Sequence, residues 1–175
     1  MSKQKRISPQ DFLLQYLHEL DAVMKDNAIR MGVNRTLYGF IFKYGWFYKP
    51  CRLPKKYEFG KLHGCFDNAF DLMLNHKILT YCEGFAIAKG ATDAIEHAWV
   101  TDGTGRAIDP TWPMGGVAYA GVPLQKMYVV STTVRNMPAE GFIDDGKNNY
   151  PLLRELGDKP KEWLEETGKG IIKLK

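Results

Sequence analysis

The sequence predicts a single α+β domain. Two segments place apolar residues at the spacing of an amphipathic helix, and several short apolar segments between turn-forming residues have the length of strands. With 175 residues the chain has the size of one ordinary domain, and no internal repeat or linker divides it. We therefore expect one domain over residues 1–175, with a catalytic-like core over about 60–135.

The first helix is predicted over about residues 9–31. Ser8 is suited to cap this helix, Pro9 suits its first position, and Asp11 lies three residues after the cap, as in a capping box. Apolar residues then recur at helical spacing until Gly32, a residue typical of a helix end. This segment is expected to be an additional helix outside the catalytic-like core.

The middle of the chain supplies a second helix. Residues 37–48 are apolar on all sides, which leaves helix or strand open, and a charged, proline-containing loop is expected over about 49–64. From Cys65 onward the apolar residues again have the spacing of an amphipathic helix. Cys65 therefore lies at the N-terminus of a predicted helix.

Strands are expected after this helix. The segments LTYCEGFAIA, IEHAWVTD and RAIDPTW are short, apolar and flanked by turn-forming residues. AYAGVPL follows a glycine-rich loop, and QKMYVVSTTVRN is compatible with helix or strand. PKEWLEET predicts a short terminal helix that begins at its proline.

Composition excludes several classes of protein. The chain is 45% hydrophobic and 25% charged, which is typical of a globular protein and not of a disordered or fibrous one. No apolar run approaches the roughly 20 residues of a membrane-spanning helix, and the N-terminus lacks the apolar core of a secretory signal, so we expect a cytoplasmic protein without a membrane partner. Three cysteines are too few for a disulfide framework. The net charge of +4 comes from basic segments without an aromatic platform, and we expect no nucleic-acid partner.

Cys65 is the candidate nucleophile. A thiol attacks a carbonyl as its thiolate, and a helix N-terminus favours that anion through unpaired N–H groups and the macrodipole. Gly64 before the cysteine leaves room for a substrate, and the N–H of Cys65 can face a developing oxyanion. The position therefore suits attack on a carbonyl carbon.

His97 and Asp109 are the candidate base and its orienting partner. If the GTG sequence at 103–105 forms a three-residue hairpin loop with its last glycine left-handed, Asp102 pairs with Arg106. His97 and Asp109 then become diagonal neighbours on one face, roughly 7–8 Å apart at the backbone, within reach of an imidazole–carboxylate bond. A two-residue loop would place them on opposite faces.

Each of these three residues also has a structural explanation that the sequence leaves open. A free cysteine at a helix start is often packed, a histidine on a strand is often a core residue bonded to a neighbour, and Asp-Pro is a common turn pair. Together, in the order helix-start Cys, strand His and next-strand Asp, they match the roles of a catalytic triad.

This combination resembles the transglutaminase-like branch of the papain-like cysteine-enzyme superfamily, and it is similar to small bacterial and phage proteins. The likeness covers roughly residues 62–124 and consists of HGCFDNAF, YCEGFA, HAWV, IDPTW and AYAGVPL. It implies an antiparallel sheet packed against a central helix that carries the cysteine at its N-terminus. It also implies that Cys65 is the nucleophile, His97 the general base and Asp109 the residue that orients the base.

The oxyanion donor departs from that family's pattern. Papain-type enzymes have a glutamine six residues before the cysteine, where this chain has Phe59. His63, Asn68 and Tyr81 are the candidate replacements, although Asn68 equally suits an ordinary helix position and Tyr81 a packed strand position. Glu83 shares a strand face with apolar residues, and it lines the site or lies at a strand edge near water.

The expected substrate is a peptide, a protein or a small amide, which reacts through a thioester with water or an amine as acceptor and needs no cofactor or metal. Two alternatives stay open. One is a binding or host-interaction module, such as a phage-derived one, that keeps the fold without the reaction. The other is a zinc protein, because four residues are potential ligands without the tight spacing of a structural zinc site: His63, Cys65, His76 and Cys82. The oligomeric state is left open.

Overall fold

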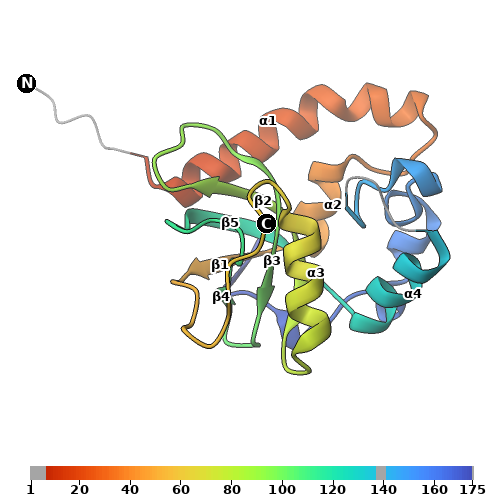
Figure 1. The fold of residues 1–175 in the computed structure, drawn as a ribbon. Coiled ribbons are helices and arrows are strands. Elements are labelled where there is room, and N and C mark those ends of the chain that lie inside the picture. Colours follow the sequence, from red (N-terminus) through yellow and green to blue (C-terminus); the bar gives the residue numbers. More distant parts are fainter. Residues whose placement is uncertain (1–6, 137–140, 175) are drawn as a thin grey trace, which may run out of the picture.

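The computed structural model describes residues 7–136 and 141–174, and within them the protein is α+β (Figure 1). The helices are α1 (Pro9–Arg30), α2 (Leu37–Tyr44), α3 (Cys65–Asn75) and α4 (Lys126–Asn136). The strands are β1 (Trp46–Pro50), β2 (Thr80–Ala88), β3 (Ile95–Thr101), β4 (Arg106–Ala107), β5 (Gly116–Leu124) and β6 (Ile172–Lys173). The α+β class predicted from the sequence is confirmed.

The strands form one curled, mixed sheet in the order β3-β2-β5-β1-β4, and β6 pairs with β1. Neighbouring strands are antiparallel except β1 and β4, which run parallel through Lys49 and Arg106. The expectation of an antiparallel sheet is wrong for this pair, because α3, β2 and β3 lie between the two strands and provide the long crossover that a parallel pair needs. The curl brings β3 to the end of β4, where Val100 and Ile108 form an antiparallel bridge.

The hairpin between β3 and β4 has the predicted register. The Val100–Ile108 bridge leaves residues 103–105 as the loop, and Gly105 has a left-handed φ of +76°. A Cβ at Gly105 would also lie 2.8 Å from the side chain of Ile171. The three-residue loop on which the meeting of His and Asp depends is therefore present.

The strand predicted in RAIDPTW is shorter than expected. Regular pairing ends at β4, and Ile108 takes part only in the isolated bridge. Pro110 has no N–H to donate, and the carboxylate of Asp109 accepts from the backbone N–H groups of Thr111 and Trp112 instead of a ladder partner. The chain therefore turns away at the aspartate.

Local sequence signals explain the helix ends. Ser8 caps α1, since its Oγ accepts from Asp11 N at 3.1 Å, and Gly32 follows the helix with a left-handed φ of +64°. Residues 37–48, for which helix and strand were both open, form α2 and then the start of β1. The segment QKMYVVSTTVRN, also open between the two, forms the helix α4. The expected terminal helix is wrong: only single 3-10 turns form at Pro160–Glu162 and Glu166–Gly168. Trp163 explains this, because its burial between the turns bends the chain inward.

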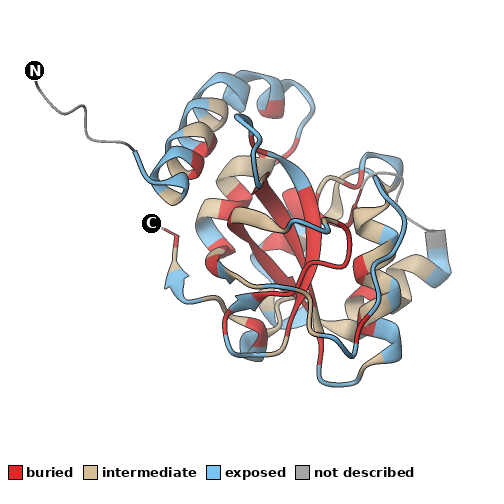
Figure 2. Cartoon of the chain, turned by 60° about the vertical axis from the view of Figure 1, so that its left-hand side comes forward, coloured by how far each residue is buried: buried red, intermediate tan, exposed pale blue. Residues whose placement is uncertain are grey.

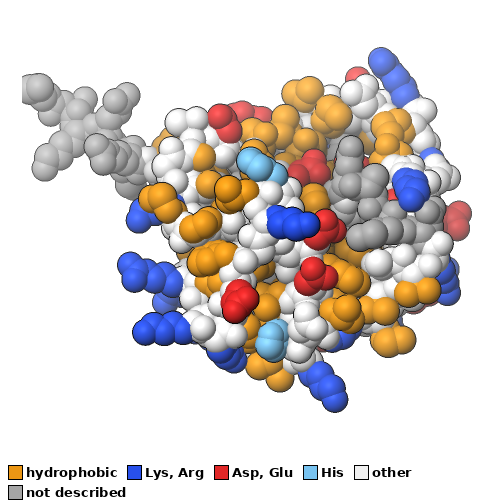
Figure 3. Space-filling model, viewed as in Figure 1, with side chains coloured by type: hydrophobic (Ala, Val, Ile, Leu, Met, Phe, Trp, Pro, Cys, Tyr) orange, Lys and Arg blue, Asp and Glu red, His pale blue; other side chains and the backbone are white. Residues whose placement is uncertain are grey.

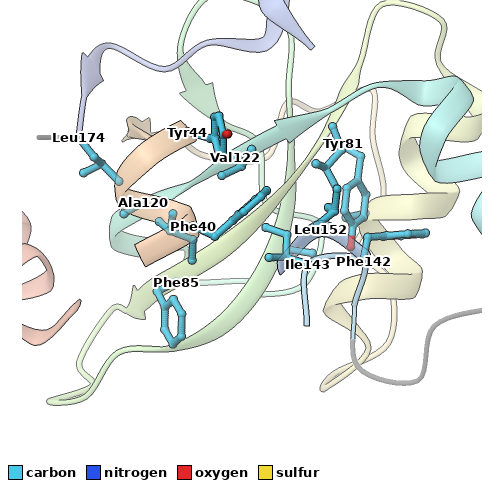
Figure 4. Close-up of a cluster of buried hydrophobic side chains, with 14 of the residues drawn as sticks. Phe40, Tyr44, Tyr81, Phe85, Ala120, Val122, Phe142, Ile143, Leu152 and Leu174 are labelled. Carbon is cyan, nitrogen blue, oxygen red and sulfur yellow. The ribbon is translucent and has the colours of Figure 1, made fainter. Parts of the chain in front are cut away.

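Both faces of the sheet are covered. Figure 2 shows burial concentrated in the strands, while the helices expose their outer sides. On one face, residues of α2, β2, β5 and the segment after α4 pack together, among them Phe40, Phe85 and Phe142 (Figure 4). On the other face lies a smaller set that we call the aromatic cluster, made of Tyr48, Cys82, Ala86, Trp99, Ala107 and Tyr119.

The surface carries charged and hydrophobic side chains together. On the face in Figure 3, Lys and Arg lie mainly around the margin, and the middle of the face carries hydrophobic, acidic and histidine side chains. Within residues 7–136 and 141–174, no helix is both long and apolar enough to cross a membrane.

Candidate active site

Cys65 is the first residue of α3, and its side chain is half-buried. Gly64 precedes it and supplies no side chain to cap the helix, so the first N–H groups of α3 have no side-chain acceptor. The helix packs closely against β3, which carries the candidate base. The cysteine therefore has open helix N–H groups and the positive end of the helix dipole beside it.

Two links hold the start of α3 against the segment that follows β4. Gly60 N donates to Pro110 O at 2.8 Å, and Asn68 Nδ2 donates to Thr111 Oγ1 at 3.0 Å. Asn68 also closes its own loop through two bonds to the backbone of Lys61. A Cβ at Gly60 would lie 2.0 Å from the Asn68 amide oxygen, so only glycine fits there. These links position the helix that carries the cysteine.

His97 and Asp109 meet as the hairpin register predicts. His97 Nε2 lies 2.9 Å from Asp109 Oδ2, and the exposed fractions of the two residues are 1% and 2%. Because an ionised carboxylate only accepts hydrogen bonds, Nε2 carries the proton and Nδ1 is left as the acceptor for a thiol. This is the tautomer that a general base for Cys65 requires.

The carboxylate of Asp109 accepts four hydrogen bonds. Oδ1 accepts from the N–H groups of Thr111 and Trp112, and Oδ2 accepts from His97 and from the hydroxyl of Tyr119 at 2.8 Å. The Tyr119 hydroxyl in turn accepts from Gly116 N at 2.7 Å. Such a fully bonded carboxylate stays fixed in position.

The pKa of His97 is raised by its partners. Burial lowers this pKa, but hydrogen bonding to Asp109 and to Cys65, together with their negative charges, raises it by more. The imidazole therefore interacts with both the carboxylate and the thiol. The protonated form is therefore more favourable than in a free histidine, and that form stabilises a thiolate.

Trp112 covers one face of the imidazole. Its ring stacks on that of His97 with centroids 3.8 Å apart and an interplanar angle of 12°. Trp99 and Tyr119 of the aromatic cluster also lie near the imidazole, at 6.5 and 6.3 Å between centroids. Water is thereby kept from the His97–Asp109 pair, which strengthens their electrostatic interaction.

The three candidate oxyanion side chains have different surroundings in the structure. His63 is exposed in a left-handed turn with φ of +64°. Both amide N–H groups of Asn68 are already donated, to Lys61 O and Thr111 Oγ1. Tyr81 is buried and donates to Glu83 Oε2 at 3.1 Å. The backbone N–H of Cys65 remains as the donor nearest the thiol.

Glu83 lies on the opposite face of the sheet from His97. It is 5% exposed, and its two oxygens accept from the N–H groups of Phe142 and Ile143, each at 2.8 Å. Burial raises the pKa of Glu83 to about 7, although the hydrogen bonds from Phe142, Ile143 and Tyr81 lower it. Glu83 is thus a buried anchor for the segment after α4 and not a strand-edge residue near water.

The remaining cysteines and histidines lie apart from one another. Cys82 belongs to the aromatic cluster, and burial raises its pKa far above the usual value. Cys51 donates to Ala107 O at 3.0 Å, and burial raises its pKa as well. Among the described residues, no three His, Cys, Asp or Glu side chains are grouped to hold a metal ion, so His63, Cys65, His76 and Cys82 do not form the ligand set of the zinc alternative.

Three residues of the site had no role in the sequence interpretation. Thr111 and Trp112 stand in the IDPTW motif itself, where their position directly after the aspartate is the available signal. Tyr119 lies on β5, and only the β2–β5 pairing, with Ala86 opposite Tyr119, brings it to the face that His97 occupies. No protein-family model, no curated protein sequence and no solved structure matches this chain.

Proposed function

We propose that this protein is a cysteine-dependent hydrolase or acyltransferase that acts on an amide bond through a thioester. The observation that carries the proposal is the buried 2.9 Å bond between His97 Nε2 and Asp109 Oδ2, formed by an imidazole that also interacts with Cys65 at the start of α3. The order of these residues and the packing of α3 against β3 support a relationship to the transglutaminase-like branch of the papain-like enzymes. We include that fold relationship in the proposal.

The first half of the proposed reaction forms the thioester on Cys65. The Cys65 thiol gives its proton to His97 Nδ1, and the thiolate attacks the carbonyl carbon of the substrate. The carbonyl oxygen takes the negative charge and faces the N–H of Cys65. The imidazolium then gives its proton to the leaving amine as the C–N bond breaks and the thioester forms. Asp109 stays ionised and holds the ring.

The second half of the reaction releases the acyl group. His97 takes a proton from water or from an amine, and that acceptor attacks the thioester carbonyl. The C–S bond breaks, and the leaving Cys65 thiolate takes the proton of the imidazolium, which restores the thiol and the neutral imidazole. Water as acceptor gives hydrolysis, and an amine gives transfer.

Competitive alkylation tests the assignment of the nucleophile. At near-neutral pH we expect iodoacetamide to label Cys65 well before Cys51 and Cys82, as followed by peptide mass spectrometry. Because burial alone protects Cys82, the decisive comparison is between Asp109→Asn, which should slow labelling of Cys65, and Asp102→Asn on the same hairpin, which should not. Labelling of Cys65 that is unchanged in Asp109→Asn would favour the binding-module alternative.

An activated ester tests the thioester directly. With p-nitrophenyl acetate we expect a burst of nitrophenolate of about one equivalent per chain, lost in Cys65→Ala and retained in Cys51→Ala. Added methylamine that speeds the steady phase and yields N-methylacetamide would indicate acyl transfer, and an unchanged steady phase would indicate hydrolysis. A burst that survives Cys65→Ala would exclude the mechanism.

A further inference from the structure

A cavity of about 560 Å³ adjoins the triad on the side of Asp109 and Trp112. It lies between the loop after β1, the end of β2 and the loop that joins β4 to β5. Its volume is within the range of about 300–1,000 Å³ that is typical of ligand sites. The residues that line it are Pro50, Cys51, Arg52, Leu53, Phe59, Lys89, Asp109, Trp112, Pro113, Met114, Gly115 and Gly116.

The cavity is positively charged. Arg52 and Lys89 line it, both are exposed, and neither makes a side-chain hydrogen bond or ion pair with the described part of the chain. The only carboxylate in the lining is Asp109, whose oxygens already accept four hydrogen bonds. An anion that enters the cavity therefore meets two cations without a carboxylate of their own.

Some cations outside the cavity have a carboxylate partner within the chain. Arg106, on the hairpin close by, pairs with Asp102 at 2.5 Å, and Arg35 and Lys43 both pair with Asp158. Arg52 and Lys89 have no such partner among the described residues, and both line the same cavity. An anionic ligand in this cavity can supply the opposite charge to both.

Apolar groups form the rest of the wall. Phe59 and Met114 are 47% and 72% exposed, and Trp112 presents to the cavity an indole that also stacks on His97. Exposed apolar side chains beside a charged group are typical of a site for a ligand with an apolar body and one polar end. Trp112 joins this wall to the reaction centre, because the same ring contacts the base.

We infer that the cavity is a substrate subsite for an anionic group, a carboxylate or a phosphate, attached to an apolar body. The inference rests on the proposed function in one respect: it takes the bound group to be the part of the substrate next to the scissile amide. In that setting Arg52 and Lys89 hold the anion, Phe59 and Met114 contact the apolar body, and Trp112 aligns it with the triad. The substrates selected are then acidic amides.

Binding of hippurate to the full chain tests the subsite without reference to activity. Hippurate carries an aromatic ring, an amide and a carboxylate, and hippuramide is the neutral match. By isothermal titration we expect hippurate to bind at least about tenfold more tightly than hippuramide, with an affinity that falls as salt rises. Arg52→Gln and Lys89→Gln should each lower the affinity for hippurate by about threefold or more, which is the contribution of one exposed ion pair.

Lys55→Gln is the matched control, because Lys55 is exposed on the same loop as Arg52 and does not line the cavity. It should leave hippurate binding unchanged. Phenyl phosphate distinguishes the two anions: tighter binding than hippurate indicates a phosphate ligand, and weaker binding indicates a carboxylate. Equal affinity for hippurate and hippuramide, no saturable binding of either anion, or insensitivity to both glutamine substitutions would overturn the inference.

The two proposals fail separately. If Cys65 gives the acyl burst and hippurate binding does not depend on Arg52 or Lys89, the subsite is wrong and the activity stands. If hippurate binds through those cations and Cys65 gives no burst, the subsite stands as a ligand site and the proposed reaction is wrong.

Discussion

Asp109 and Glu83 are both buried carboxylates, and they lie on opposite faces of one sheet. Asp109 shares Oδ2 between a histidine and a tyrosine, whereas Glu83 gives both of its oxygens to backbone N–H groups and a further bond to Tyr81. Burial raises the pKa of Glu83 to about 7, and the like charge of Glu96 adds to this rise. In the proposed function a titratable partner makes the first carboxylate part of the reaction centre, whereas backbone partners make the second an anchor.

The largest effect is expected for Asp109→Asn. An asparagine keeps the size of the side chain but cannot hold the imidazolium by charge, and it permits the wrong histidine tautomer. We expect acylation by p-nitrophenyl acetate to fall by about 10³–10⁴-fold, with the unfolding free energy changed far less. Stopped-flow bursts and urea unfolding of the same preparation measure both quantities. A loss of stability as large as the loss of rate would mean that Asp109 is an anchor like Glu83.

The second prediction concerns the pH dependence that Glu83 gives to stability. Its folded pKa, about 7, lies above the ordinary value of 4.5, so this group contributes stability below pH 4.5 that is lost as pH rises through 7. A shift of this size corresponds to roughly 3 kcal/mol at about 1.4 kcal/mol per pH unit.

Glu83→Gln removes this titration. The unfolding free energy of the wild type minus that of the variant should decrease by up to roughly 3 kcal/mol as pH rises from about 4.5 to 7, as urea unfolding at several pH values would show. Glu96→Gln is the comparison, since it removes the like charge and leaves the carboxylate in place. A difference that stays constant over this range would contradict a raised pKa.

The third prediction concerns the loop that brings Asp109 to His97. Gly105→Ala places a Cβ in a left-handed residue and 2.8 Å from Ile171, so we expect a loss of about 1–2 kcal/mol from the backbone and a further loss from the contact. Gly90→Ala isolates the first part, because Gly90 has φ of +89° and no heavy atom among the described residues lies within 4 Å of its added Cβ. Thermal unfolding should therefore give a lower midpoint temperature for Gly105→Ala than for Gly90→Ala. Equal losses would show that the contact at 105 is unimportant.

The smallest effect is expected for Tyr119→Phe. It removes one of the four bonds to Asp109 and leaves Gly116 N without its acceptor, at a cost of about 1–2 kcal/mol. If Tyr119 positions the carboxylate, the pH profile of Cys65 alkylation should also shift, which a purely structural role would not cause. Trp163→Phe, far from the site, is the control for lost stability alone. An unchanged pH profile would restrict Tyr119 to packing.

The meeting of His97 and Asp109 could be predicted because it depends on local geometry. The length of the loop and the left-handed glycine fix the pairing of two consecutive strands, and alternation then fixes which side chains share a face. The start of α3 at Cys65 has a local cause too, since the apolar spacing begins there. The interaction between the cysteine and the histidine was expected from the order of the three residues and from the resemblance, and not from local geometry, because residues 66–96 separate them along the chain.

Other features had no local signal. Glu83 bonds to Phe142 and Ile143 across some sixty residues, and nothing near it in the sequence indicates those partners. The parallel pairing of β1 with β4 depends on how the whole sheet curls. The role of Asn68 was left open for a related reason. Its side-chain amide bonds to the backbone of Lys61, in a loop that is held by the bond from Gly60 N to Pro110 O, a residue far along the chain.

By itself, then, the sequence determined the α+β class, the ends of the first helix and the hairpin that places His97 beside Asp109. Each of these follows from residues within a few positions of one another, where propensity, capping and turn geometry act. Only the tertiary structure decided that Tyr119 and Trp112 complete the surroundings of the pair, that Glu83 is an anchor, and that Arg52 and Lys89 share a cavity. Those relations depend on long-range packing. Burial and strand order bring together residues that are far apart in the sequence, and the residues adjacent to each of them give no signal of the partner.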